Sequence, residues 1–173
     1  MPIAELQRDI STIGTQYVYP SRSLHVSLLG CTPREEDKQD PASVRATRIR
    51  DAIADVVGSA GPVGVEVGRL NLLGMQLFLE VYTDSPKWAR MRVDLADALA
   101  ALGERPITYA DPEPMHLNIS RLEGPPDTSR LHQTLGDSSV GLNVLARLTY
   151  VDVVVTDFVL SPEGLVIVDT IQL

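Results

Sequence analysis

The chain has 173 residues, of which 44% are apolar and 22% are charged, and this composition predicts one globular domain with a sizeable core. The net charge of −8, from 15 basic and 23 acidic residues, argues against binding of duplex DNA, because such proteins present a basic face. No stretch approaches 18 uninterrupted apolar residues, and the N-terminus lacks a signal-peptide pattern. We therefore expect a cytoplasmic protein with no membrane partner.

Cys31 is the one cysteine in the chain. A single cysteine cannot form an intramolecular disulfide, which fits a reducing compartment. No basic residue is adjacent in the sequence to stabilise a thiolate. We interpret Cys31 as a small buried apolar residue and not as a nucleophile.

The first part of the chain predicts a short strand, an alternating strand and a helix. The short strand covers residues 17–19, and apolar and polar residues then alternate over residues 24–30. A polar loop follows over residues 32–41, where Asp40 is the expected helix cap and Pro41 the first helical residue. The helix ends at glycines, and its apolar stripe contains Val44, Ile49, Ile53, Val56 and Val57.

A predicted hairpin and a second helix come next. Residues 63–70 and 75–82 have strand patterns, and the segment between them, near residues 71–74, has the composition of a turn. The second helix has a Ser85 cap followed by Pro86. Its apolar stripe contains Trp88, Met91, Leu95, Leu99 and Leu102, and Gly103 is the expected stop.

The last third contains an alternating strand over residues 115–121 and a short helix over residues 128–135. Two strands, over residues 148–160 and 165–173, are joined by a tight turn at residues 161–164. The unit of one histidine-containing strand, one helix and two strands thus occurs twice. We predict an α+β fold: one two-lobed domain over residues 1–173, duplicated, with two mostly antiparallel sheets backed by helices around a central cleft.

Two short motifs are the strongest functional signal. Leu24-His25-Val26-Ser27-Leu28-Leu29-Gly30 and Met115-His116-Leu117-Asn118-Ile119-Ser120-Arg121 both alternate. Side chains two apart in a strand share a face, so His25 lies beside Ser27, and His116 lies beside Asn118. The chain has three histidines in all, and two of them occupy equivalent positions in these strands.

Paired histidines suit phosphoryl chemistry at neutral pH. One can remove a proton from an attacking hydroxyl or water while the other protonates the departing oxygen. The Ser27 hydroxyl and the Asn118 amide can donate hydrogen bonds to non-bridging phosphate oxygens. A lone histidine in a strand is more often structural, and a scaffold with buried, satisfied histidines remains an alternative.

The two motifs resemble the paired His-x-Thr/Ser motifs of the two-histidine phosphoesterase superfamily, which includes the bacterial RNA 2′,3′-cyclic phosphodiesterases, also called 2′-5′ RNA ligases. The motif spacing, the intervening helix and hairpin, and the ending Phe158-Val159-Leu160-Ser161-Pro162-Glu163-Gly164-Leu165 are also similar. The resemblance covers nearly the whole chain from about residue 17.

The resemblance implies a bilobal fold and a metal-independent cyclic phosphodiesterase without a cofactor. It implies that His25 and His116 are the catalytic pair and that Ser27 and Asn118 bind phosphate. The expected substrate is a small nucleotide or an RNA end, and we expect a monomer. Which histidine is the base is left open.

The second motif departs from the family, because it has Asn118 where Thr or Ser is usual. An asparagine still donates a hydrogen bond, but its longer amide must be oriented by its neighbours. The departure leaves open an alternative function: a non-catalytic module that binds nucleotides with the same fold.

Other candidates carry weaker signals. Strand parity places Arg121 on the face opposite to the histidine and Ser120 on the same face as Asn118. Two histidines without a third ligand at suitable spacing make a zinc site incomplete. The remaining candidates are Arg22 for an anionic substrate, His132 on the short helix, Trp88 as a core residue, and Tyr17, Tyr19 and Tyr109 for stacking on a base.

Overall fold

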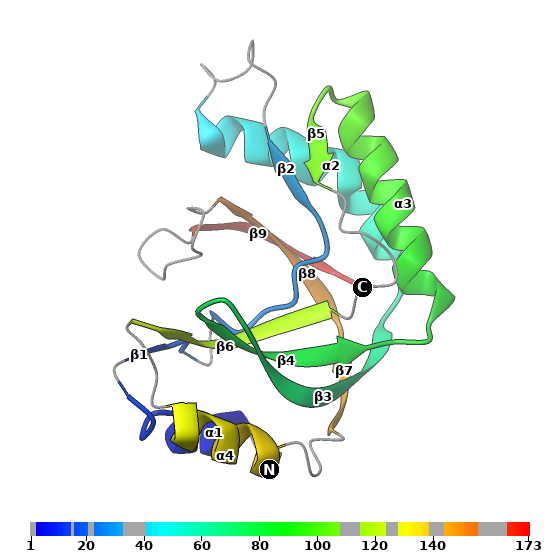
Figure 1. The fold of residues 1–173 in the computed structure, drawn as a ribbon. Coiled ribbons are helices and arrows are strands. Elements are labelled where there is room, and N and C mark those ends of the chain that lie inside the picture. The colour runs from blue at the N-terminus through cyan, green and yellow to red at the C-terminus, as the bar shows by residue number, and fades with distance from the viewer. Residues whose placement is uncertain are drawn as a thin grey trace. The chain divides into compact units, whose positions relative to one another are not determined.

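The computed structural model describes residues 3–14, 16–20, 23–32, 41–107, 115–123, 128–138, 144–155 and 166–173. Helices and strands alternate in these ranges as expected for an α+β protein (Figure 1). The helices are α1 (Ile3–Ile10), α2 (Ala42–Ala60), α3 (Pro86–Ala101) and α4 (Thr128–Ser138). The strands are β1 (Gln16–Val18), β2 (Gly30–Thr32), β3 (Val63–Leu73), β4 (Gln76–Tyr82), β5 (Arg105–Ile107), β6 (Met115–Leu122), β7 (Val144–Leu148), β8 (Tyr150–Val155) and β9 (Val166–Gln172).

The described strands form one large sheet and two small ones. The large sheet has five strands in the order β1-β6-β4-β3-β7, and the small sheets pair β2 with β5 and β8 with β9. The chain divides into two compact units, of which the first comprises Met1–Ser27, Val65–Tyr82 and Glu113–Ala146. The second comprises Leu28–Gly64, Thr83–Pro112 and Arg147–Leu173. Two comparable sheets, as a duplication predicts, are not evident among these strands.

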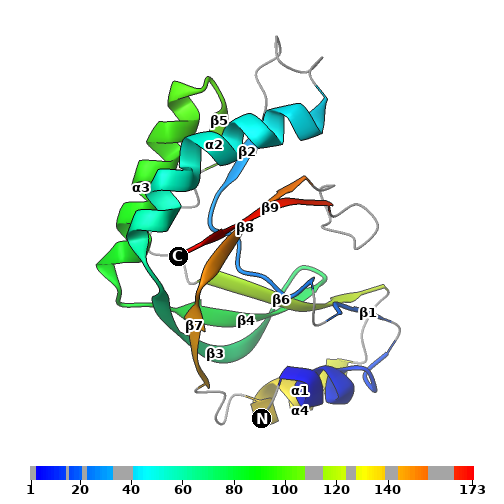
Figure 2. The same cartoon turned by 180° about the vertical axis from the view of Figure 1, so that it is seen from behind.

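In the first unit, helices α1 and α4 lie together against one face of the large sheet (Figures 1 and 2). Leu6 and Ile10 of α1 and Leu131 of α4 are buried there. They pack on the apolar face of β4 and β6, where Leu79 and Ile119 are fully buried. Burial of these side chains stabilises the unit. The polar residues His116 and Asn118 of β6 lie on the opposite face.

Sequence patterns did not predict helix α1. It has eight residues, and its apolar positions Ile3, Leu6 and Ile10 follow helical spacing. So short a segment contains too few turns to establish a period from sequence alone. Its stability therefore depends on packing against the sheet, since Leu6 and Ile10 are both 0% exposed.

In the second unit, α2 packs against α3 and against the β8–β9 pair. The predicted stripe of α3 is confirmed, because Trp88, Met91, Leu95 and Leu99 are buried. Leu102 is exposed, since the helix ends at Ala101 and the chain turns at Gly103 with a positive φ of 85°.

Helix α2 begins one residue later than predicted, at Ala42, and ends at Ala60, next to the predicted stop at Gly61. Ile53 and Val57 are buried as expected, but Val44 is 50% exposed and Ala46 is buried instead. Pro41 precedes the helix without a side-chain cap hydrogen bond. The predicted cap Asp40 lies outside the described residues.

The predicted β3–β4 hairpin is confirmed. Val63, Val65 and Val67 are buried on one face, as their alternation requires. The strands continue to the pair Leu73 and Gln76, so the turn is shorter and later than predicted. Gly74 adopts a φ of 60° at this turn, a conformation that favours glycine.

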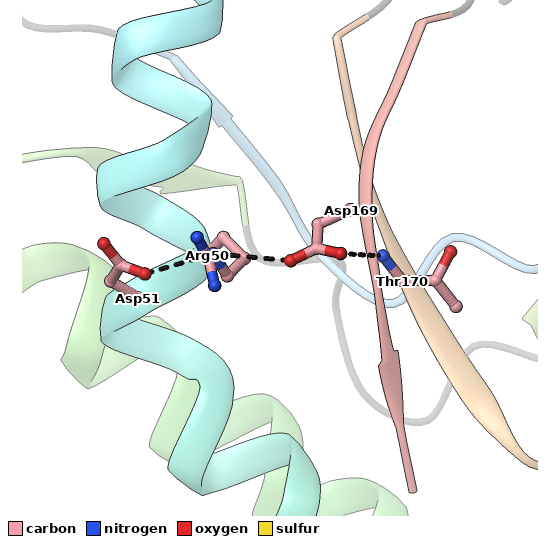
Figure 3. Close-up of polar contacts among 4 residues, drawn as sticks. All are labelled: Arg50, Asp51, Asp169 and Thr170. Carbon is pink, nitrogen blue, oxygen red and sulfur yellow. Dashed lines mark hydrogen bonds and ion pairs between the residues drawn. The ribbon is translucent and has the colours of Figure 1, made fainter.

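A surface ion pair links α2 to β9 within the second unit (Figure 3). The Arg50 Nε lies 3.4 Å from Asp169 Oδ2 and 3.0 Å from Asp51 Oδ1. The other carboxylate oxygen of Asp169 accepts a hydrogen bond from the backbone N–H of Thr170 at 2.8 Å. The Arg50 and Asp169 side chains are 39% and 42% exposed, so solvent screens their attraction and the pair contributes little stability.

No helix within the described ranges has the length and apolarity to cross a membrane. Several predictions fall outside those ranges. They concern Arg22, Tyr109, the turn at residues 161–164 and the family-like ending at residues 158–165.

Candidate active site

Strand β6, which lies between β1 and β4 in the large sheet, carries the second histidine motif. It pairs antiparallel with β4 on one side and with β1 on the other. Leu117 is buried at 8% exposure and Ile119 at 0%, which fixes the apolar face of the strand. His116 is exposed and Asn118 is half-buried on the opposite face. The alternation predicted for this motif is therefore confirmed from Met115 to Asn118.

The first motif is less regular than predicted. Residues 24–29 do not form a continuous strand, and the nearest strand, β2, begins at Gly30. Val26 instead makes an isolated antiparallel bridge with Leu117. Val26 of the first motif and Leu117 of the second thus lie side by side in the first unit, whereas the duplication predicted two equivalent sheets.

This bridge sets the register of the two motifs. With Val26 opposite Leu117, an antiparallel register brings Ser27 beside His116 and His25 beside Asn118. The residues directly before and after a bridged pair along each strand point to the opposite face of the sheet from the pair itself. All four predicted site residues therefore belong to the face of the large sheet opposite α1 and α4, which we call the site face.

A β-bulge interrupts β6 immediately after Asn118. Asn118 pairs with Phe78 of β4, but the next residue of β4 back along the chain, Leu77, pairs with Ser120. Ile119 is therefore the extra residue, and it reverses the alternation of the strand. Ser120 is fully buried, and its hydroxyl donates a hydrogen bond to the Tyr17 carbonyl at 3.0 Å. The prediction that Ser120 shares a face with Asn118 is wrong for this reason.

The same bulge moves Arg121 onto the site face. Arg121 pairs with Gln76, while Asn118 pairs with Phe78 and His116 with Glu80. These three β4 residues alternate along one face, so their partners share it. Arg121 is exposed there, although simple parity placed it on the opposite face. The site face thus carries a cation that sequence reasoning assigned to the wrong side.

The imidazole of His25 has a defined hydrogen-bond partner. Its Nδ1 lies 2.8 Å from the Ser23 carbonyl oxygen. A carbonyl oxygen only accepts hydrogen bonds, so Nδ1 must carry a proton and donate it. In the neutral ring, Nε2 is then the nitrogen with a free lone pair. This contact orients the half-buried ring and leaves Nε2 for proton transfer.

His116 is bordered by an aromatic ring and a carboxylate from β4. The Phe78 and His116 ring centroids are 4.4 Å apart at an interplanar angle of 53°, a contact that restricts the imidazole. Glu80 is the cross-strand partner of His116 and accepts a hydrogen bond from the Tyr82 hydroxyl. That hydrogen bond raises the pKa of Tyr82 above its ordinary value.

The structure describes the surroundings of three other candidates, His132, Tyr19 and Trp88. His132 is exposed on α4, which covers the face opposite the site face. Tyr19 is 3% exposed and makes an edge-on contact with Tyr17 at 5.2 Å, an arrangement of core packing. Trp88 is 8% exposed on α3, as predicted for a core residue.

Cys31 is half-buried in the second unit. Burial raises the pKa of its thiol, and the Glu104 carboxylate raises it further, while Arg45 opposes both effects. The net direction favours the neutral thiol, which agrees with the expectation that Cys31 is not a nucleophile, although the residue is half-buried and not buried as predicted. Among the described residues, His, Cys, Asp and Glu side chains do not gather in groups of three or more that could hold a metal.

The residues of the site face can perform acid–base chemistry on an anion. Imidazoles can transfer protons near neutral pH, and hydroxyl and amide groups such as those of Ser27 and Asn118 can donate hydrogen bonds to an anion. A family model described as the 2′-5′ RNA ligase superfamily matches residues 2–159. The chain belongs to this superfamily of two-histidine phosphoesterases. Membership agrees with the resemblance of the two motifs.

Comparison with solved structures finds a similar chain, described as "Crystal Structure of MHV ns2 PDE Domain". The sequences are 15% identical, the TM-score is 0.49, and the match covers 70% of this chain and 68% of that chain. No curated protein matches the sequence at a significant level.

Proposed function

We propose that this member of the superfamily is a metal-independent phosphodiesterase. Its substrate would be a 2′,3′-cyclic phosphate, or a related 2′-linked phosphodiester, of an RNA end or a small nucleotide. The observation that carries the proposal is the bridge between Val26 and Leu117, since it brings two histidines and two donors onto one face. We further propose a single two-lobed, duplicated domain that acts as a cytoplasmic monomer.

In the proposed reaction His25 and His116 are the acid–base pair. In antiparallel strands, diagonal neighbours stand about 7–8 Å apart, a separation that admits a phosphate between two imidazoles. Nε2 is the His25 atom that exchanges the proton, because Nδ1 is held by the Ser23 carbonyl. One imidazole accepts a proton from the attacking hydroxyl or water, and the other donates a proton to the departing oxygen.

Neighbouring hydrogen-bond donors would stabilise the negative charge on the phosphate. The Ser27 hydroxyl and the Asn118 amide would bind non-bridging phosphate oxygens, and the Arg121 guanidinium adds a positive charge on the same face. The chain has a net charge of −8, so a small nucleotide or a single RNA end suits it better than a long duplex. Glu80 beside His116 disfavours additional negative charge at that end of the site.

The direct test is hydrolysis of nucleoside 2′,3′-cyclic monophosphates in the presence of EDTA. We expect turnover by the wild type and a rate at least about 10²-fold lower in the His25→Ala/His116→Ala double variant. The position of the phosphate in the product identifies the oxygen that leaves. Lack of turnover with both mononucleotides and RNA ends bearing a cyclic phosphate would contradict the proposal.

Asn118 favours one alternative, a module that binds nucleotides without turnover. Replacing Asn118 with Thr restores the hydroxyl that is usual in the family, and we expect the rate of hydrolysis to rise. The shorter side chain needs no amide orientation to donate to phosphate. If the wild type binds 2′- and 3′-nucleotides in a thermal-shift assay, turns none over, and gains activity with Asn118→Thr, the binding module is the correct function.

A further inference from the structure

Gln7 is a buried polar residue on α1 that reaches two distant backbone carbonyls. It is 7% exposed, and its Nε2 donates hydrogen bonds to Tyr19 O at 2.7 Å and to Ile119 O at 3.1 Å. The side-chain amide has two N–H groups, one for each carbonyl. Its neighbours Leu6 and Ile10 anchor the helix in the core, so the amide is held in place.

The Ile119 carbonyl belongs to the bulge that shapes the site face. Ile119 is the extra residue between the pairs formed by Asn118 and Ser120, and its carbonyl also accepts a hydrogen bond from the Tyr19 N–H at 3.1 Å. A bulge disrupts the sheet ladder locally and leaves backbone groups to be satisfied in another way. Gln7 therefore supports the backbone next to Asn118.

The Tyr19 carbonyl lies where the chain leaves β1 and continues towards His25. Tyr19 follows β1 directly, and the Ser23 N–H then donates to the Pro20 carbonyl at 2.8 Å in the turn that follows. Ser23 in turn presents the carbonyl that orients His25. One side chain thus joins the segment leading to the first motif with the strand that carries the second.

We infer that Gln7 is a positioning residue that sets the relative placement of His25 and Asn118. It touches no substrate and acts through the backbone of Tyr19 and Ile119. This inference rests on the proposed function, because it assigns a role within that site. A displacement of about 1 Å at acid–base groups can lower a rate by about 100-fold, so loss of this link has a kinetic effect beyond its effect on stability.

The test compares Gln7→Met with Leu6→Ala. Methionine keeps the length of the side chain and removes both N–H donors, whereas Leu6→Ala removes core volume from the same helix and leaves the donors intact. With both proteins assayed well below their unfolding temperatures, we expect Gln7→Met to lower kcat by about 10- to 100-fold and to change KM less. We expect Leu6→Ala to keep the wild-type kcat. Equal kcat values for Gln7→Met and wild type, or an equal loss in Leu6→Ala, would overturn the inference.

Gln7→Glu is a second variant in case Gln7→Met does not fold. An ionised carboxylate cannot donate to the two carbonyls, but a protonated carboxyl can donate to one. The ratio of variant to wild-type kcat should therefore rise as the pH falls through the carboxyl's titration range. A ratio independent of pH contradicts a role for the donor.

NMR spectra of the histidine side chains test the positioning role without relying on activity, so failure of this inference can be distinguished from failure of the proposed function. The ring resonances of His25 and His116 report their surroundings without any substrate. We expect them to shift in Gln7→Met and to stay at wild-type positions in Leu6→Ala. If the wild type hydrolyses no cyclic phosphate but these shifts occur, the positioning role stands and the proposed activity does not. Unchanged resonances in Gln7→Met refute the positioning role.

Discussion

Replacing either His25 or His116 with Ala is expected to lower the rate of 2′,3′-cyclic phosphate hydrolysis by about 10²- to 10⁴-fold. Each variant removes one proton-transfer group while the donors of the site face remain. The fold should persist, because His116 is exposed and His25 is half-buried. Steady-state kinetics with a nucleoside 2′,3′-cyclic monophosphate, together with circular dichroism, measure the two effects separately.

His132→Ala is the matched control for these variants. His132 is exposed on α4, on the face opposite the site face, so its loss should leave the rate unchanged. The double variant His25→Ala/His116→Ala should lose less than the product of the single losses, because groups that act as a unit are not additive. Wild-type turnover in either single variant would show that the acid–base assignment is wrong.

Glu104→Ala is expected to lower the free energy of unfolding by about 3–5 kcal/mol. The Arg45 Nε donates to Glu104 Oε1 at 2.8 Å, and the two side chains are 16% and 5% exposed. Removing the carboxylate leaves a guanidinium of α2 largely buried without its counter-charge. Urea unfolding followed by the fluorescence of Trp88, the one tryptophan of the chain, measures the change.

Asp169→Ala is the matched control, because it breaks the solvent-exposed pair with Arg50 (Figure 3). Screening by solvent limits its effect to less than about 1 kcal/mol. The variant Arg45→Met/Glu104→Met should recover part of the loss, since an apolar pair of similar length leaves no buried charge. Equal effects of Glu104→Ala and Asp169→Ala would mean that burial does not strengthen the Arg45–Glu104 pair.

Local patterns in the sequence determine most of the regular elements and point to the family. Helical spacing of Trp88, Met91 and Leu95 predicts the buried face of α3, because that period is a property of the helix itself. Alternation predicts β3 in the same way. The paired histidine motifs point to the superfamily without any knowledge of their spatial relation, since residue type and spacing carry that signal.

The bulge at Ile119 is a feature that sequence alternation cannot reveal. Parity placed Ser120 on the site face and Arg121 behind it, whereas the structure buries Ser120 and brings Arg121 onto the site face. A bulge is defined by the count of residues on two paired strands, β4 and β6 here. One strand read alone contains no sign of it.

Long-range pairing decides the rest of the site. The bridge between Val26 and Leu117 joins residues 91 positions apart, and Gln7 reaches Ile119 across a separation of 112 residues. The pair of Arg45 and Glu104 spans 59 residues. The sequence by itself determined helices α2, α3 and α4, the main strands, the family and the two histidine motifs, because each depends on local period or residue type. Only the tertiary structure decided which residues share the site face and which buried polar groups support it, because these depend on contacts between distant segments.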